Sequence, residues 1–477
     1  MASAQDPTSQ TPSSRLEETL STSARVEELS DSDYEEMETL TRHEEANQAY
    51  LKSITSPIED LLDTASSEVQ DETLRAVMPF LIGNPNDFDL NSYGLPTLQR
   101  EKHVKFLKQS LGPFPPQFAA MDASRPWVVY WCMQGLTALG QDISEYSDRV
   151  VSTFSSAQHP EGGFGGGHGQ LPHLAATYAA ILSLVIVGTE EAYASINRQT
   201  MYSYLGRMKQ VDGGFTMSPN GEEDIRGAFC ALVALSLLNL PLELPPDAPA
   251  RQHGLTSFLD NLGEWVSRCQ TYEGGISAAP GNEAHGAYAF CGLGCLSIMG
   301  PPKDTINKWL DVPALINWLN SRQSCPEGGF HGRGNKLVDG CYSHWVGGCW
   351  ALVEAAAGKG IWNRAALGRY ILSAAQFKKG GLVDKPGKRP DAYHTCYNLA
   401  GLSWAQYDWK YEKSEGERGE LDAPYHWQLD GEYTEDVVWD NGDMVNRVHP
   451  VFVVPFGKAE SCRKWFEEQT WSSKGTG

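Results

Sequence analysis

The chain has 477 residues, 41% of them hydrophobic, and a formal net charge of −22 at pH 7. Its length suits one large domain or two to three smaller ones. The acidic balance argues against nucleic acid as the main partner, and the sequence contains no apolar run of about 18 residues that would insert into a membrane.

The first 75 residues are rich in Asp, Glu, Ser and Thr, as between Glu27 and Glu36. We expect residues 1–75 to be an acidic, disordered extension, because such a composition buries little apolar surface. Residues 76–415 are expected to form a catalytic domain, and residues 416–477 a C-terminal extension that packs on it or flanks it. Ten cysteines without paired spacing indicate a reducing compartment. No secretory or lipidation signal is recognisable, so we expect a cytoplasmic protein.

The rest of the chain repeats itself every 50 to 60 residues or so. Each unit carries a Gln followed by a Gly-Gly turn, at which a positive φ is expected. The five Gln residues are Gln158, Gln210, Gln270, Gln323 and Gln376.

Two kinds of helix alternate around these turns. Amphipathic helices, such as those expected at Leu255–Gln270, Pro313–Gln323 and Ile361–Gln376, should be half exposed. Helices that are apolar nearly all round should be inner helices; they are expected at Trp127–Leu139, Leu174–Val187, Arg226–Leu238, Gly286–Ile298, Trp345–Ala357 and Thr395–Gln406. Six such pairs predict an all-α fold, a closed α6/α6 barrel of helical hairpins. Open helical solenoids also alternate helices, but with shorter repeats and less apolar helices.

Polar residues interrupt the inner layer at or just before the helix N-termini, which the barrel would bring to one rim. They are His173, Tyr178, Arg226, His285, Tyr288, Arg333, Lys336, Asp339, Cys341, Tyr342, Tyr393 and His394. Any one of them is explained by an ordinary half-buried polar group. The set as a whole is not, because separate repeats place polar groups at the same rim.

Asp339, Cys341 and His394 combine a carboxylate, a thiol and an imidazole, with the His about one repeat after the other two. Three protein ligands with an open fourth position are typical of a catalytic zinc site, which would activate a substrate thiol. The alternative for Cys341 is an inert buried thiol.

His285, Arg333, Lys336 and Tyr342 form a candidate binding site for a diphosphate at the same rim; the alternative is a solvated surface patch. The expected inner wall is aromatic, with Trp127, Trp131, Tyr178, Phe229, Tyr288, Trp345 and Tyr393. Core packing explains each of these singly, whereas together they suit a long apolar ligand. Transfer of a prenyl group to a cysteine would join the thiol, the metal, the diphosphate and the apolar chain.

Over residues 95 to 410 or so, the chain resembles the β subunits of protein prenyltransferases, most closely those that transfer farnesyl. The resemblance rests on Ser124-Arg125-Pro126-Trp127, Pro172-His173-Leu174, Asp224-Ile225-Arg226, Glu283-Ala284-His285-Gly286, and the runs Gly332–Ser343, Gly380–Lys388 and Asp391–Tyr397.

This resemblance implies a barrel paired with an α subunit in an obligate heterodimer. It also implies farnesyl transfer from farnesyl diphosphate to the cysteine of C-terminal C-a-a-X motifs, as in small GTPases. The roles carried over by motif are zinc binding by Asp339, Cys341 and His394; diphosphate binding by His285, Arg333, Lys336 and Tyr342, of which Lys336 and Tyr342 are also catalytic; isoprenoid binding by Arg226, Tyr288, Cys291 and Trp345; and peptide binding by Trp127, Trp131 and Tyr393.

Two residues favour farnesyl over geranylgeranyl. Trp127 is bulky where the geranylgeranyl type I enzymes have a small residue, and Asp384 matches the carboxylate that holds Mg²⁺ on the diphosphate. The alternative for Asp384 is a solvated turn residue. Two positions depart from the family pattern. Phe229 replaces the usual Tyr, and His344 replaces the usual Phe, so that its imidazole either alters the pH dependence of the site or points outward.

Three alternatives remain open at this stage. A geranylgeranyltransferase type I β subunit would share the fold and the zinc site. A triterpene cyclase also has an αα-barrel, but its Asp-x-Asp-Asp motif is absent. A binding module of the complement thioester-domain kind would carry a Gly-Cys-Gly-Glu-Gln signature, which is also absent.

Overall fold

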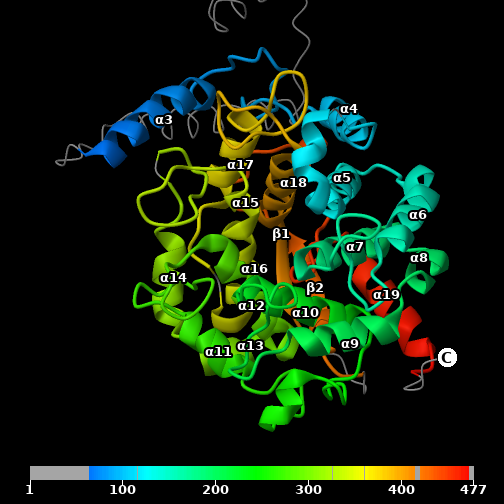
Figure 1. Ribbon diagram of the computed structural model, residues 1–477. Coiled ribbons are helices and arrows are strands. Elements are labelled where there is room, and N and C mark those ends of the chain that lie inside the picture. Colours follow the sequence, from blue (N-terminus) through cyan, green and yellow to red (C-terminus); the bar gives the residue numbers. More distant parts are fainter. Residues whose placement is uncertain (1–63, 115, 325, 359, 414–418, 472–477) are drawn as a thin grey trace, which may run out of the picture. The chain divides into compact units, whose positions relative to one another are not determined.

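The alternation of amphipathic and apolar helices produces two layers in the computed structural model (Figure 1). The structure describes residues 64–471 apart from residues 115, 325, 359 and 414–418. Most of the expected acidic extension, residues 1–63, therefore lies outside the described residues. The expected boundary at residue 75 falls inside helix α3 (Ala65–Leu81).

The inner layer is a closed ring of helices. Each contacts the next in the chain, and the last, α18, returns to contact the first, α5. Its members are α5 (Arg125–Ala138), α7 (Leu174–Val187), α10 (Ile225–Leu237), α12 (Gly286–Met299), the pair α15 (Tyr342–Trp345) and α16 (Gly347–Ala357), and α18 (Ala392–Gln406). The predicted all-α barrel of six helical hairpins is confirmed. One expected inner helix is broken at Val346, just before two consecutive glycines, which disfavour helix.

The outer layer consists of shorter helices that alternate with the inner ones. They are α4 (Arg100–Ser110), α6 (Ser147–Ala157), α9 (Arg198–Met208), α11 (Leu262–Cys269), α14 (Val312–Asn320) and α17 (Arg364–Ser373). Two further helices, α8 (Glu190–Ala194) and α13 (Pro302–Trp309), and short 3₁₀ turns at Pro116–Ser124, Ser144–Tyr146, Pro249–His253, Ala423–His426 and Asn441–Asp443 lie in the connections.

The expected helix at Leu255–Gln270 is shorter than predicted, because α11 begins only at Leu262. The Asp260 carboxylate accepts hydrogen bonds from the backbone N–H groups of Thr256 and Ser257, at 2.7 and 2.9 Å. Asn261 then adopts a positive φ of 60°. These local hydrogen bonds compete with helix formation.

Four of the five repeated Gln residues clamp one unit to the next, whereas Gln210 bonds to Met208 O within its own turn. Gln323 Nε2 donates to Asn363 O at 2.8 Å, and Asn363 N donates back to Gln323 Oε1 at 2.9 Å. Gln158 makes a corresponding pair of bonds, to Ser195 O and from Asn197 N just before α9. Gln270 bonds in the same way to the backbone of Asp311, just before α14. Gln376 makes it to Thr97 and Gln99, just before α4, and so joins the last repeat to the first.

The inner helices begin at one common rim. The backbone N–H at or near the start of α7, α10, α12 and α15 donates to a carbonyl in the loop of the following repeat; the pairs are Leu174 to Met217, Ile225 to Ala278, Gly286 to Gly332, and Gly340 to Asp384, at 2.7–2.8 Å. The loops that carry the predicted site residues are thereby linked around the rim.

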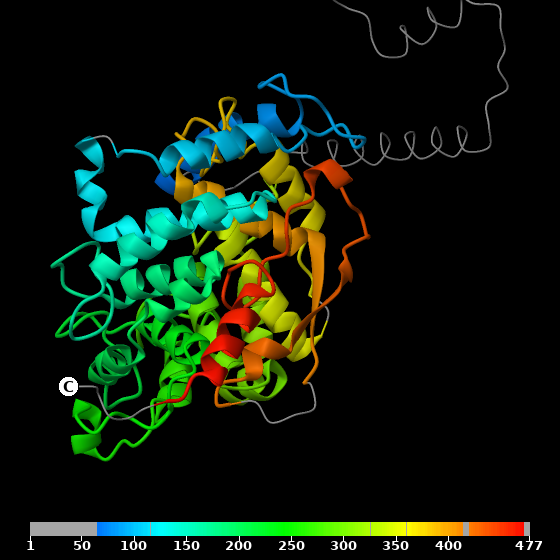
Figure 2. The ribbon, with the colours of Figure 1, turned by 90° about the vertical axis from the view of Figure 1, so that its right-hand side faces the viewer.

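The segment after α18 packs against the opposite ends of the inner helices. It contains an antiparallel strand pair, β1 (Tyr407–Tyr411) and β2 (Trp427–Glu432), and helix α19 (Lys458–Glu468), which lie on one side of the helical ring in Figure 2. Asn446 N donates to Ala138 O at the end of α5, Lys458 Nζ to Val187 O at the end of α7, and Arg463 Nη1 to Ser236 O near the end of α10. The rim at the helix N-termini is therefore the end left for the site.

Among the described helices, none combines the length and the apolar character needed to cross a lipid bilayer.

Candidate active site

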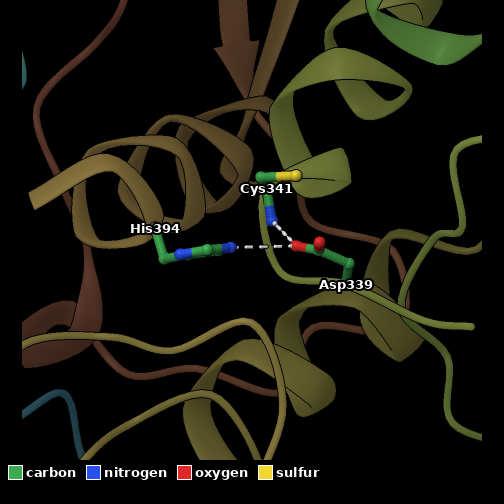
Figure 3. A group of neighbouring side chains, drawn as sticks. All are labelled: Asp339, Cys341 and His394. Carbon is green, nitrogen blue, oxygen red and sulfur yellow. Dashed lines mark hydrogen bonds and ion pairs between the residues drawn. The ribbon is translucent and has the colours of Figure 1, made fainter. Parts of the chain in front are cut away.

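Asp339, Cys341 and His394 converge at the rim, as the sequence predicts. Asp339 and Cys341 immediately precede α15, and His394 lies in the first turn of α18. The Asp339 carboxylate and the His394 ring point toward each other, with Cys341 beside them (Figure 3). One potential ligand atom from each lies within 4.8 Å of the others. A carboxylate, a thiol and an imidazole in this arrangement are suited to a divalent transition metal.

Asp339 is the centre of the hydrogen bonding in this group. Its Oδ1 accepts from Cys341 N at 2.8 Å and lies 3.3 Å from His394 Nε2. Burial opposes ionisation of Asp339, but the hydrogen bonds from His394 and Cys341 outweigh it and lower its pKa. Burial and the nearby Asp339 raise the pKa of the Cys341 thiol well above its usual range.

Asp391 orients His394 from the other side. It is the N-cap of α18, and its carboxylate accepts from His394 N and pairs with His394 Nδ1, both at 2.7 Å. Burial alone would lower the pKa of His394, but Asp339 and Asp391 together raise it to about 9. A carboxylate on the outer nitrogen of a metal-binding His fixes its tautomer and ring orientation. No role was predicted for Asp391 from the sequence, although an Asp three residues before a His at a helix start is a recognisable capping signal.

His285 and Tyr342 also meet at the rim, with His285 Nε2 at 3.0 Å from the Tyr342 hydroxyl. His285 Nδ1 accepts from Ala287 N at 3.1 Å, so the neutral ring carries its proton on Nε2. Burial and the nearby Arg333 lower the pKa of His285 to about 4. His285 is thus a neutral hydrogen-bond donor rather than a member of a cationic cluster.

The two flexible cations of the predicted diphosphate site differ in their surroundings. Arg333 forms an ion pair with Glu283, whereas Lys336 is exposed on the loop between Arg333 and Asp339. Arg226 is held by Asp224, the N-cap of α10, with Nε 3.0 Å from Asp224 Oδ2, and its guanidinium lies 5.9 Å from the Tyr288 ring centre. Glu283 and Asp224 belong to the motifs of the resemblance, but no role was predicted for either carboxylate.

Asp384 does not belong to the three-residue metal group, although it lies near enough to Asp339 to interact electrostatically with it. Burial and Asp339 raise its pKa, and its carboxylate pairs with Lys385.

Aromatic side chains form an unbroken circuit around the inner ring. Consecutive ring centroids are 4.8–5.9 Å apart along Trp131, Trp127, Tyr178, Phe229, Phe290, Trp345, Tyr397, Tyr393 and back to Trp131. Helices α5, α7, α10, α12, α15 and α18 each contribute at least one ring to this circuit. Trp127, Trp131, Tyr288, Trp345 and Tyr393 are half-buried, whereas Tyr178, Phe229, Phe290 and Tyr397 are buried, as is Cys291. Phe290 and Tyr397 were missed in the sequence, where they look like ordinary core residues.

The metal group and the aromatic circuit touch at Tyr393. The Tyr393 ring lies 5.0 Å from the His394 ring, centroid to centroid, and the Tyr393 hydroxyl accepts from Trp345 Nε1 at 3.0 Å. An ion held by Asp339, Cys341 and His394 would therefore sit beside an apolar, aromatic surface.

His344 does not point outward, so that expectation is wrong. It is fully buried, stacks on Tyr397 with ring centroids 4.9 Å apart, and accepts from Trp404 Nε1 at 3.1 Å through Nδ1. Burial lowers its pKa to about 3. Phe229 packs between Tyr178 and Phe290 as part of the circuit.

Comparison with known proteins identifies the family. The family model described as the prenyltransferase alpha-alpha toroid domain matches residues 98–454. The protein farnesyltransferase subunit beta of Pyricularia oryzae is 47% identical, over 86% of this chain and 82% of its own length. That of Schizosaccharomyces pombe is 37% identical, over 84% of this chain and 96% of its own.

A more distant likeness extends to the geranylgeranyl branch. The geranylgeranyl transferase type-1 subunit beta of Arabidopsis thaliana is 26% identical over 64% of this chain. The structure of Candida albicans protein geranylgeranyltransferase-I complexed with GGPP superposes with a TM-score of 0.58 at 20% identity, covering 78% of this chain and 99% of that one, which supports the fold alone. The chain belongs to the prenyltransferase αα-toroid family and, within it, to the protein farnesyltransferase β subunits, which makes it a prenyltransferase.

Proposed function

We propose that this chain is the catalytic β subunit of a zinc-dependent αβ heterodimer in the cytoplasm. It transfers farnesyl from farnesyl diphosphate to the cysteine thiol of C-terminal C-a-a-X motifs, for example in small GTPases. The observation that carries the proposal is the contact between the Asp339, Cys341 and His394 group and the aromatic circuit, made by the rings of His394 and Tyr393. That contact would bring an activated thiol next to an apolar chain.

Zinc held by Asp339, Cys341 and His394 would lower the pKa of the substrate thiol, so that it reacts as thiolate. His285 and Tyr342, whose Nε2 and hydroxyl bond to each other at 3.0 Å in the structure, would turn these groups to the departing diphosphate as hydrogen-bond donors, while Arg333 and Lys336 supply positive charge. Arg333 must exchange its ion pair with Glu283 for the diphosphate.

The aromatic residues position the two substrates. Trp345, Tyr288, Cys291 and Arg226 hold the isoprenoid, and Trp127, Trp131 and Tyr393 face the peptide, so that the thiol and the first carbon of the lipid meet in line. Asp384 would bind Mg²⁺ on the diphosphate once it is released from Lys385. Trp127 shortens the apolar site and favours farnesyl over geranylgeranyl.

The test is the Cys341→Ala variant, co-expressed with an α subunit. We expect it to lose zinc and to reduce transfer by at least a hundredfold, since one of the three protein ligands is gone. Cys462→Ala, which removes a buried thiol on α19, is the matched control and should keep both. Zinc content and turnover at parental levels in Cys341→Ala would contradict the proposed metal site.

A further inference from the structure

The metal group is assembled from two separate segments, so something must fix the distance between them. Asp339 and Cys341 precede α15, whereas His394 belongs to α18. Helices α15 and α18 contact each other directly. A small slide of α15 along α18 would separate the thiol and the carboxylate from the imidazole.

The two segments approach so closely that side chains are excluded at two points. A Cβ at Gly340 would overlap Asn398 Nδ2, and a Cβ at Gly401 would overlap the Ser343 side chain. Gly340 and Ser343 are three residues apart, as are Asn398 and Gly401, so the two pairs face each other across one interface. Gly340 is also the residue between the ligands Asp339 and Cys341.

Asn398 is the polar centre of this interface, and its side chain is fully buried. Its Nδ2 donates to His394 O at 2.9 Å and to Val383 O at 3.2 Å. Its Oδ1 accepts from Ser343 Oγ at 3.5 Å. One amide thus reaches the backbone of a metal ligand, the loop before Asp384, and the helix that follows Cys341.

The hydrogen bonds of Asn398 leave the Val383–Asp384 loop in a fixed place relative to Gly340. Gly340 N donates to Asp384 O at 2.7 Å, and the Tyr370 hydroxyl donates to the same carbonyl at 2.7 Å. Buried amides that are fully bonded are costly to remove, because their partners are left without a bond.

We propose that Asn398 is a positioning residue for the metal site. Its amide holds α15, α18 and the Val383 loop in the register in which Asp339, Cys341 and His394 can share one ion. The inference rests on the proposed function, in that the ion is zinc. Partners of this kind in other metal sites change metal affinity about 10- to 100-fold when they are removed.

The experiment measures zinc affinity by competition with a chelator, together with the thermal midpoint, in the αβ complex. Asn398→Ala should weaken zinc binding about tenfold or more. Asn398→Ser keeps a hydroxyl that can donate to His394 O but is too short to reach Val383 O. This variant should fold even if the Ala variant does not. It should weaken zinc binding by a smaller factor than Asn398→Ala. The control is Ser403→Ala, which removes a buried group on the same helix that accepts from Val448 N at 3.2 Å, far from the ligands.

We expect Ser403→Ala to lower the thermal midpoint while leaving zinc affinity at the parental value. Parental zinc affinity in both Asn398 variants, or an equal loss in Ser403→Ala, would overturn the positioning role. Failure of the proposed function would look different, because the parent would then bind zinc no more tightly than Cys341→Ala.

Discussion

Two imidazoles at the same rim, those of His285 and His394, have pKa values shifted in opposite directions because their neighbours differ. Two carboxylates raise the pKa of His394 to about 9, whereas burial and Arg333 lower that of His285 to about 4. The convergence of Asp339, Cys341 and His394 could be predicted from the sequence, because the repeat places Asp-x-Cys and a His one unit later at the same rim. The pKa shifts of His394 and His285 could not be predicted, since they depend on Asp391 and Arg333. These two residues come to lie beside the imidazoles only when the rim has folded.

His344 provides a test of acid sensitivity. Its folded pKa of about 3 lies below the unfolded value of about 6.5, so between these pH values the unfolded chain binds a proton that the native chain does not. Stability should therefore fall as the pH drops through this window, by about 1.4 kcal/mol per pH unit for this group. We expect His344→Phe to have a shallower slope of unfolding free energy against pH between 6 and 4 or so, measured by urea unfolding.

Trp404→Phe is the control for this experiment. It removes the same indole hydrogen bond at 3.1 Å but keeps the imidazole, so it should lower stability at every pH and retain the parental slope. An unchanged slope in His344→Phe would show that this His is protonated in the native state.

At the scale of elements, the bounds of the apolar inner helices were predicted to within a few residues, because a helix that is apolar all round must be buried. The exceptions have local causes. The Asp260 carboxylate delays the start of α11, and the break at Val346 divides α15 from α16. The repeated Gln was visible in the sequence, but its role as a clamp between repeats was not, since the partner backbone lies some 40 residues away.

The Gln clamp predicts unequal costs for one substitution in two repeats. Gln323→Ala loses the bonds to Asn363 O and from Asn363 N, and should lower the free energy of unfolding by about 1–3 kcal/mol. Gln210 makes no such bridge among the described residues, since its Nε2 donates to Met208 O within its own turn. Gln210→Ala should therefore cost less when both are compared by urea unfolding. Equal losses of unfolding free energy in the two variants would mean that the clamp between repeats does not stabilise the fold.

At the scale of the molecule, one end of the helical ring is covered by the segment from β1 to α19, and the other carries the metal group, the cations and the aromatic circuit. The placement of that segment could not be predicted, because it follows no repeat and bonds to residues up to 352 positions away, as Asp443 Oδ2 does in accepting from Asn91 Nδ2. The repeats, by contrast, determine the ring, and with it the rim on which the site is built.

The most direct test of the account is a lipid competition. The chain, co-expressed with a candidate α subunit, would be offered farnesyl and geranylgeranyl diphosphate together with a peptide ending in a C-a-a-X motif, with and without Mg²⁺. We predict farnesyl transfer that Mg²⁺ stimulates, as Trp127 and Asp384 require. Geranylgeranyl transfer that is independent of Mg²⁺ would contradict the lipid assignment, and no transfer by a stable, zinc-loaded complex would contradict the proposed function as a whole.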